Sequence, residues 1–343
     1  MAGRPTIADL AKAAGVSVAT VDRVLNGRHR VREETARRVY DAAKSIGYHA
    51  VGLLRQRVFE DLPQYRLGFI LQKPNQFFYQ SMAREIENAA LSAPSIRVIP
   101  QIDFAASSTP TAITEKLRAM AARNQAIALV GPDYPAVTTV VEELKERGIP
   151  VFSLLSDFAT GVREGYVGLN NRKAGRTAAW MIAKAATRPG KVAAFVGSHR
   201  FHGHELREIG FRSYFREHAP EFEVLDTLVN LETAEITHEA TLNLLQRHPD
   251  LIGFYVCGGG MEGAISALAE EKLARKLLVV VNELTPESRA ALAEDLVTMA
   301  IATPVAQLAR ELVGLMVGAI DRGLAAVPGQ TFLPFDIFTP ENI

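Results

Sequence analysis

Residues 6–27 read TIADLAKAAGVSVATVDRVLNG, and residues 31–50 continue VREETARRVYDAAKSIGYHA. In both stretches apolar residues recur every three or four positions, which is the spacing of one face of a helix. We expect three helices, over about 6–14, 18–25 and 35–46. Two short helices joined by a tight turn and closed by a third are the arrangement of a helix-turn-helix DNA-binding domain, whose second helix enters the major groove.

Two residues of the first stretch mark where helices end and begin. Gly15 follows the first predicted helix, where the chain needs a residue that tolerates a positive φ. Ser17 precedes the second helix, and its hydroxyl is suited to cap the free N–H groups of a helix N-terminus. The positions expected to face one small core are Ile7, Leu10, Ala11, Val16, Val21, Val24, Ala36, Val39, Ala43 and Ile46.

The N-terminal segment is basic although the whole chain is neutral. The 343 residues include 38 Lys and Arg and 38 Asp and Glu, a formal net charge of zero. Residues 1–57 hold eleven Lys or Arg and five acids, so this segment carries 11 − 5 = +6 and the remainder carries −6. A basic segment of this size is expected to meet phosphates in a salt-dependent way. The competing interpretation is a helical hairpin with a solvated cationic face.

The same residues resemble the head of the LacI/GalR transcription regulators. The resemblance is most specific in TIADLAKAAGVSVATVDRVLNG and VREETARRVYDAAKSIGY, and in a looser form it covers nearly the full chain. It implies a cytoplasmic homodimer that binds a pseudo-palindromic operator. It also implies a small-molecule effector that controls the fit, with no cofactor and no enzymatic activity.

The candidate DNA contacts gather on the second predicted helix. Val18 and Ala19 lie in its N-terminal turn, which faces base edges in such domains. Arg23 is the one long donor on this helix and is suited to pair with guanine. The full set of expected DNA-binding residues is Thr6, Ser17, Val18, Ala19, Thr20, Arg23, Asn26, Arg30, Leu54 and Arg57.

Residues 51–63 are expected to form a hinge between the head and the rest of the chain. The resemblance implies that this segment becomes a short helix on the operator, with a leucine wedged into the minor groove. Arg57 occupies the usual wedge position here, and Leu53 and Leu54 lie one turn earlier. One interpretation is that an arginine enters a narrow minor groove electrostatically. The other is that the two leucines pack the hinge helices together.

From residue 64 onward, short apolar runs alternate with helical patterns, which predicts an α/β body. The pattern repeats twice, so we expect two lobes, each a doubly wound parallel sheet with helices on both faces. The first lobe is expected over about 64–168 and 303–328, and the second over about 169–302 and 329–343. This organisation resembles the periplasmic sugar-binding proteins, in which a ligand lies between two lobes.

The predicted strand ends supply a candidate effector site, because ligands of such sheets bind beyond the carboxyl ends of the strands. Arg207, just inside a helix, presents a planar fork of donors that suits vicinal hydroxyls or a carboxylate. The expected effector-binding residues are Phe77, Phe78, Asp133, Asn170, Arg207, Cys257, Asn282 and Glu283. The effector class is a sugar, a polyol or a sugar acid. Simpler roles remain open: a surface position for Arg207, capping for Asp133 and Asn282, and core packing for the two phenylalanines.

A rival interpretation comes from the sequence VCGGGMEGAISA. Gly258, Gly260 and Gly263 fit a dinucleotide-binding fingerprint that follows a strand and opens a helix, and Glu283 lies 20 residues beyond Gly263. This pattern alone predicts an NAD(H) sensor or an enzyme. Against it, the segment is the third strand-helix unit of its lobe, and glycines also serve where backbones pack closely.

Other chemistry finds little support in the sequence. A single cysteine excludes an internal disulfide framework. His199, His202 and His204 cluster in one stretch, but a structural metal site usually needs four ligands, so we expect no metal. No apolar run approaches the length of a membrane span, and no secretion signal opens the chain, so we expect no membrane partner.

Overall fold

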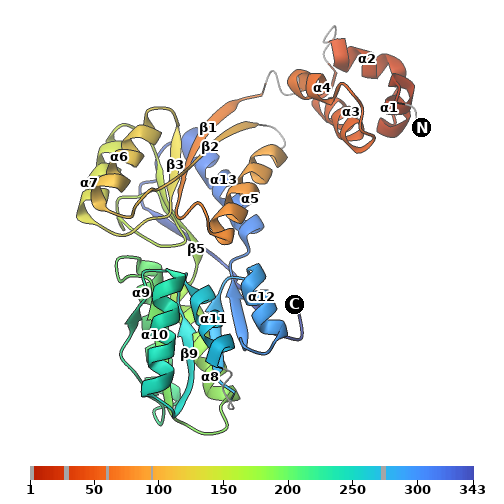
Figure 1. Cartoon of the computed structure of the whole chain (residues 1–343). Helices are drawn as coiled ribbons and strands as arrows, with labels where there is room; N and C mark the ends of the chain where they lie inside the picture. Colours follow the sequence, from red (N-terminus) through yellow and green to blue (C-terminus); the bar gives the residue numbers. More distant parts are fainter. Residues whose placement is uncertain (1–3, 27–30, 59–61, 94–95, 272–275) are drawn as a thin grey trace. The chain divides into compact units, whose positions relative to one another are not determined.

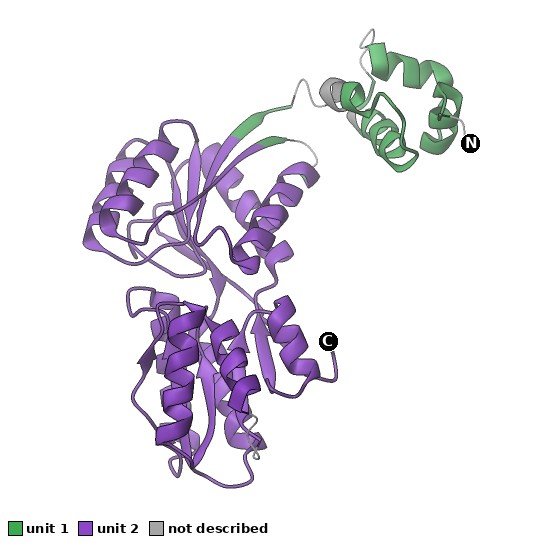
Figure 2. Ribbon diagram, viewed as in Figure 1, with its two compact units in different colours: residues 1–65, 93–98 green, residues 66–92, 99–343 purple. Residues whose placement is uncertain are grey.

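Two compact units make up the computed structural model of this chain (Figures 1 and 2). It describes residues 4–26, 31–58, 62–93, 96–271 and 276–343. The first unit comprises residues 1–65 and 93–98, and the second comprises residues 66–92 and 99–343. The helical head lies in the first unit and the α/β body in the second, so the predicted fold class is confirmed.

The described part of the head contains four helices: α1 (Ile7–Ala14), α2 (Val18–Asn26), α3 (Glu33–Ser45) and α4 (Val51–Val58). The first three lie within two residues of their predicted bounds. Gly15 ends α1 with a φ of 63°, and Thr6 begins it with a capping box to Asp9. The Arg38 side chain donates to the carbonyl oxygens of Ala14 and Gly15, which ties α3 to the end of α1.

One small apolar core holds these helices together, as the spacing of the apolar residues predicts. Its buried members are Leu10, Ala11, Ala14, Val21, Val24, Val39, Ala42, Ala43, Tyr48 and Leu54. The other predicted inward residues, Ile7, Val16, Ala36 and Ile46, pack against it partly buried. Burial of about ten side chains is modest, which is typical of a domain of this length.

A six-stranded sheet in the order β12-β5-β4-β3-β1-β2 forms the first lobe of the body. Its strands are β1 (Gln64–Leu71), β2 (Arg97–Phe104), β3 (Ala126–Leu129), β4 (Val151–Leu154), β5 (Gly165–Leu169) and β12 (Gly329–Leu333). Its helices are α5 (Phe77–Ser92), α6 (Pro110–Ala121), α7 (Pro135–Glu146) and α13 (Val305–Arg322). Helices α5 and α13 cover one face of the sheet and α6 and α7 the other (Figure 1).

A seven-stranded sheet forms the second lobe, in the order β13-β11-β10-β9-β6-β7 with β8 also paired to β6. Its strands are β6 (Lys191–Val196), β7 (Glu223–Val224), β8 (Leu228–Val229), β9 (Leu251–Val256), β10 (Leu278–Asn282), β11 (Met299–Ala302) and β13 (Asp336–Phe338). Its helices are α8 (Asn171–Ala185), α9 (His202–His218), α10 (Ala234–Arg247), α11 (Met261–Glu271) and α12 (Pro286–Ala293). Alternate residues of each strand pack under α8 and α9 on one face and under α10, α11 and α12 on the other.

Residues 329–343 were predicted to belong to the second lobe, and for strand β12 this prediction is wrong. Strand β12 pairs in parallel with β5, with Gly329 opposite Gly165 and Leu333 opposite Leu169, so it belongs to the first lobe. The chain reaches the second lobe only at β13, which pairs antiparallel with β11. The physical reason is that β5 without β12 would present an unpaired sheet edge.

Helices α8 and α9 lie unusually close because each has a glycine at their contact. A Cβ atom on Gly175 would lie 1.9 Å from the carbonyl oxygen of Arg207. A Cβ atom on Gly210 would lie 2.2 Å from the carbonyl oxygen of Arg172. These neighbours are backbone atoms, so they give way only if a whole helix moves. The contact therefore fixes the position of α9, which carries Arg207.

Candidate functional site

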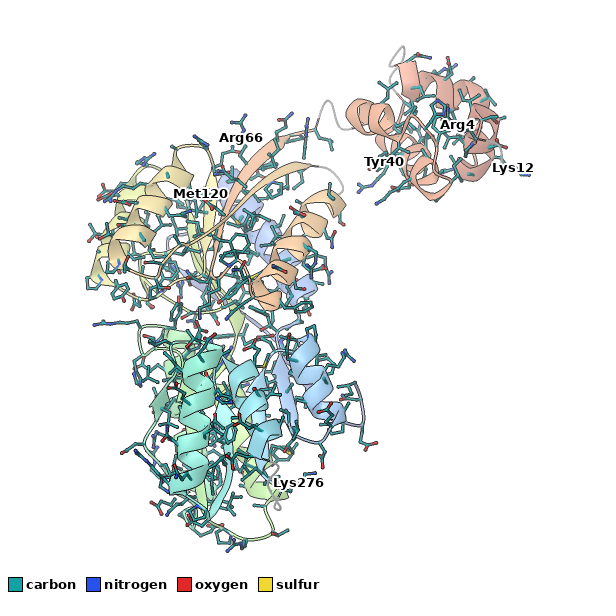
Figure 3. The ribbon with its side chains drawn as sticks, viewed as in Figure 1. Arg4, Lys12, Tyr40, Arg66, Met120 and Lys276 are labelled. Atoms are coloured by element: carbon teal, nitrogen blue, oxygen red, sulfur yellow. The ribbon has the colours of Figure 1, made fainter. Side chains whose placement is uncertain are left out.

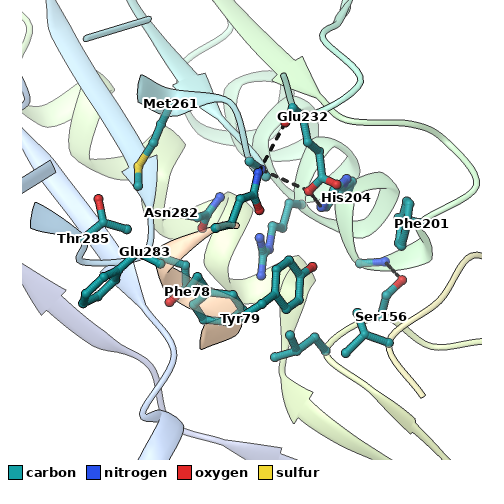
Figure 4. A pocket seen from close by; sticks show the side chains of 18 of the residues that line it. Phe78, Tyr79, Ser156, Phe201, His204, Glu232, Met261, Asn282, Glu283 and Thr285 are labelled. Carbon is teal, nitrogen blue, oxygen red and sulfur yellow. Dashed lines mark hydrogen bonds and ion pairs between the residues drawn. The ribbon is translucent and has the colours of Figure 1, made fainter. Parts of the chain in front are cut away.

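A pocket opens between the two lobes of the body, where strands of both sheets end (Figure 4). About 740 Å³ of empty space lies in it, part of which is open to solvent. The first lobe lines it with Gln76, Phe77, Phe78, Tyr79, Val130, Leu155 and Ser156. The second lobe contributes Phe201, Gly203, His204, Arg207, Glu232, Gly258, Gly259, Met261, Glu262, Asn282, Glu283 and Thr285. Its place at the strand ends, between two lobes, is typical of a small-molecule site.

Arg207 is a buried polar side chain of this pocket, held by two hydrogen bonds. Its Nε donates to Oδ1 of Asn171 over 2.8 Å, and its Nη1 donates to the carbonyl oxygen of Cys257 over 2.7 Å. The residue is only 7% exposed, and no described residue bonds its Nη2. The expected two-pronged fork is therefore partly used within the protein, and Nη2 is the nitrogen left for a ligand.

Aromatic side chains from the start of α5 form one wall of the pocket. Phe77 and Phe78 line it as the sequence analysis expects, and Tyr79 beside them was not foreseen. The ring centroids of Phe78 and Tyr79 lie 5.2 Å apart, edge to face. Phe77 is 42% exposed, so it is no ordinary core residue. Aromatic faces of this kind can stack on the apolar face of a sugar ring.

Asn282 and Glu283 also reach the pocket, from the end of β10. Asn282 is buried, with its Oδ1 accepting from the Tyr255 hydroxyl and its Nδ2 donating to the carbonyl oxygen of Val256. Glu283 has a φ of 71°, and its carboxylate accepts the N–H and hydroxyl of Thr303. Burial raises the pKa of Glu283 despite these two bonds.

Three expected effector residues, Asp133, Asn170 and Cys257, do not line this pocket. Asp133 is exposed, does not line the pocket, and accepts the backbone N–H of Ala159. Asn170 caps α8 by accepting the N–H of Lys173. Cys257 points its side chain into the second-lobe core, and only its carbonyl oxygen meets Arg207. In each case a local bond or the direction of the strand decides the orientation.

Four polar residues at the pocket were not expected from the sequence. Asn171, and not its neighbour Asn170, holds Arg207 and also donates to the carbonyl oxygen of Leu155. Tyr79, Glu232 and Glu262 were also not expected, whereas His204 belongs to the histidine cluster noted in the sequence beside Arg207. Asn171 and Tyr79 adjoin residues that were singled out. Glu232 lies in a loop whose path only the tertiary structure defines.

Glu232 lies at the centre of the charged groups that join the two lobes. Lys73 of the first lobe donates to the carbonyl oxygens of Leu231 and Glu232, and its Nζ lies 3.6 Å from the Glu232 carboxylate. Burial alone would raise the pKa of Glu232, but the His204 ring, Lys73 and the Gly259 N–H together hold it below its usual value. Burial lowers the pKa of His204 to about 4, against the attraction of the Glu232 carboxylate.

The glycines of the rival fingerprint have packing roles. A Cβ atom on Gly263 would lie 1.9 Å from the carbonyl oxygen of Ala234, and one on Gly258 would lie 2.6 Å from the His204 ring. The Gly259 N–H, which a pyrophosphate would need, already donates to Glu232. The dinucleotide interpretation therefore gains no support.

The head presents an exposed surface along α2. Val18 is 47% exposed, and Ala19, Arg23 and Asn26 are exposed with it, whereas Thr20 is half-buried. Ser17 accepts the N–H of Thr20, as expected of a cap. Elsewhere on the head, Arg4 and Lys12 are exposed basic side chains (Figure 3). The exposed residues of α2 are therefore free to contact base edges in the major groove, as predicted.

The hinge prediction is only partly met. Helix α4 packs on α2 and α3, and Leu54 lies fully buried in the head core, so its assignment to the operator is wrong for this conformation. Leu53 is 46% exposed. Arg30 and the side chain of Arg57 lie outside the described residues.

Comparisons with known proteins agree with both parts of the chain. Residues 67–324 match the family described as periplasmic binding protein domain, and residues 6–50 match the bacterial regulatory proteins of the lacI family. The HTH-type transcriptional regulator GntR of Pseudomonas aeruginosa is 25% identical over 270 residues, 77% of this chain and 74% of that protein. An uncharacterized HTH-type transcriptional regulator of Streptomyces limosus is 28% identical over 279 residues, 78% of this chain and 75% of that protein.

Solved structures share the fold of the body. GanP, a glucose-galactose binding protein from Geobacillus stearothermophilus, has a TM-score of 0.74 at 18% identity and covers 82% of this chain and 99% of its own. A solute-binding protein from Actinobacillus succinogenes with bound D-allose has a TM-score of 0.72 at 20% identity, covering 82% and 98%. In the described part of this chain, no helix is both long and apolar enough to cross a membrane.

Proposed function

Because the chain belongs to the lacI family of bacterial regulatory proteins and is a DNA-binding transcriptional regulator, we propose that it is a repressor controlled by a small polyhydroxy effector. The effector binds between the two lobes of the body, and its binding changes the affinity of the heads for operator DNA. A protein that acts on operator DNA works in the cytoplasm, where the chromosome lies.

One observation carries the effector part of this proposal. The aromatic wall of the first lobe faces Arg207 of the second lobe across one pocket, and Arg207 has an Nη2 that no described residue bonds. An aromatic face and a fixed donor suit the two sides of a sugar ring, one apolar and one rich in oxygen. The solved sugar-binding proteins of the same fold make this ligand class the first to test.

Switching follows if the effector prefers one arrangement of the lobes. A ligand shifts an equilibrium only by its difference in affinity for the two states. Lys73 already joins the first lobe to the Leu231–Glu232 loop of the second, so small rearrangements at this contact are coupled to the pocket. A tenfold change in operator affinity requires only about 1.4 kcal/mol of coupling.

We expect a panel of monosaccharides and polyols to contain a compound that raises the melting temperature of the purified chain. A ligand at a hundred times its Kd adds about 2.7 kcal/mol to stability. Differential scanning fluorimetry identifies the compound, and fluorescence anisotropy of a labelled operator shows whether it changes DNA binding. A compound that stabilises the protein without altering operator affinity would contradict the switching role.

The head is expected to read DNA through the exposed side of α2. Arg23→Ala should relax the preference at one operator position by about 1–3 kcal/mol, because Arg23 is the long donor on that helix. Binding selection with sequencing measures the change. Lys12→Ala is the control: this exposed residue of α1 should lower affinity evenly, with no change in sequence preference. If Arg23→Ala keeps the same operator preference, Arg23 does not contact a base edge.

The proposed regulator acts as a homodimer that reads two half-sites about one helical turn apart. Residues 329–343, which include β12 and β13, carry no heptad pattern for a coiled coil. Static light scattering at micromolar concentration should therefore give the mass of two chains. A mass of one or four chains would contradict the proposal.

A further inference from the structure

The charged groups around the pocket leave it with an excess of negative charge. Three carboxylates line it, on Glu232, Glu262 and Glu283. Two cations face them: Arg207 in the lining, and Lys73, whose Nζ lies 3.6 Å from Glu232. Acidic side chains therefore outnumber basic ones around the pocket, three against two.

Glu262 is the carboxylate in the pocket that no other described residue holds by a hydrogen bond or ion pair. Glu232 accepts the Gly259 N–H and faces Lys73, and Glu283 accepts two bonds from Thr303. Glu262 is half-buried at the start of α11, and no side chain in the described part of the chain bonds or pairs with it. Its oxygens are therefore acceptors that a ligand can satisfy.

Two nearly buried polar groups point to a ligand independently of these acids. The hydroxyl of Tyr79, a residue only 8% exposed, has no hydrogen bond to a described residue, and Tyr79 lies in the pocket lining (Figure 4). Nη2 of Arg207, a residue 7% exposed, is also unpartnered among these residues. Neither atom is fully buried, because both residues line the open pocket, and a bound molecule with hydroxyl groups is expected to bond to them.

Most helix N-termini near the pocket already have an acid in the first turn. Helices α5, α9, α11 and α12 begin close to lining residues, and the N-terminus of a helix favours negative charge. An acid lies in the first turn of α9 (Glu205), α11 (Glu262) and α12 (Glu287), whereas α5 has none. Of these three acids only Glu262 lines the pocket, so at α11 a carboxylate of the chain occupies the position that an anionic ligand would take.

We propose that the pocket accepts uncharged polyhydroxy compounds and rejects their anionic counterparts, and that Glu262 is the residue that determines this choice. The proposal rests on the proposed function, because it concerns the same pocket. A sugar hydroxyl donates to the Glu262 carboxylate, whereas a sugar acid or sugar phosphate brings a like charge to it. Arg207 remains the donor to ring oxygens in both cases.

The test compares matched pairs of compounds by isothermal titration calorimetry on the full chain. The pairs are D-glucose with D-gluconate, D-galactose with D-galactonate, D-mannose with D-mannonate, and D-glucose with its 6-phosphate. We expect the neutral member of at least one pair to bind at least tenfold more tightly than its anion. Glu262→Gln should reduce that ratio at least threefold, mainly by strengthening binding of the anion.

Glu205→Gln is the matched control. Glu205 is also an acid in the first turn of a helix, but it does not line the pocket, and it contacts His202 instead. The Glu205→Gln variant should leave the ratio of neutral-sugar to anion affinity unchanged. A sugar acid that binds as tightly as its neutral counterpart would overturn the inference and leave the effector function intact. An unchanged ratio in Glu262→Gln, or loss of all binding there, would overturn the role of Glu262. If no compound of either kind binds, the proposed effector function itself fails.

Discussion

Replacing Arg207 by alanine is expected to abolish the effector response while operator binding stays intact. Arg207 is buried, held by Asn171 and the Cys257 carbonyl oxygen, and offers Nη2 to the pocket. Truncating a buried, hydrogen-bonded charged group at an interface typically costs about 2–5 kcal/mol. The effector concentration needed for a half-maximal response should thus rise by a factor on the order of 100 or more.

Anisotropy of a labelled operator, titrated with the effector, measures this response. Asp133→Ala is the control, because Asp133 lies outside the pocket lining and only accepts the Ala159 N–H. It should respond as the unaltered chain does. The melting temperature of Arg207→Ala should also be recorded, since Asn171 and Cys257 lose a partner. A normal response in Arg207→Ala would place the effector elsewhere in the body.

Replacing Gly175 by alanine should destabilise the body strongly, although alanine favours helices. The new Cβ atom would lie 1.9 Å from the carbonyl oxygen of Arg207, a backbone atom of α9. Overpacking in a core typically costs about 1–3 kcal/mol and occasionally more. Because the obstacle is backbone, we expect about 3 kcal/mol, which outweighs the gain of about 1 kcal/mol from helix propensity.

Gly314→Ala supplies a control with the opposite sign. Gly314 also lies inside a helix, α13, but a Cβ atom there meets nothing within 4 Å. It should raise the free energy of unfolding by about 0.5–1 kcal/mol. Urea unfolding followed by circular dichroism compares the two variants. Equal effects of the two substitutions would show that the close contact of α8 and α9 is unimportant for stability.

Gly175→Ala should also weaken the effector response, because the substitution displaces a residue of the pocket. The clash is with the backbone of Arg207 itself, so relief of the clash moves the guanidinium relative to Asn171. Stability and ligand recognition are thus coupled through one helix contact. Measuring both in the same variant tests that coupling.

Strands with a regular apolar pattern were predictable and irregular ones were not. Strand β1 reads as an apolar run and was expected. Strand β2 was missed, because RVIPQIDF contains a proline and alternates poorly. Such a sequence is tolerated at a sheet edge, and β2 is the edge strand beside β1. Strand β12 was assigned to the wrong lobe, because its partner β5 lies far from it in sequence.

The sequence by itself determined the three helices of the head, the double α/β rhythm of the body and the strand ends at which the pocket lies. Those features depend on the spacing of apolar residues along the chain, which can be read directly from the sequence. Only the tertiary structure decided that Asn171 holds Arg207 while Asn170 caps a helix, and that Leu54 is core. Adjacent residues point in different directions, so a side chain's role depends on what the fold brings to face it, from sequence positions as distant as Lys73 and Glu232.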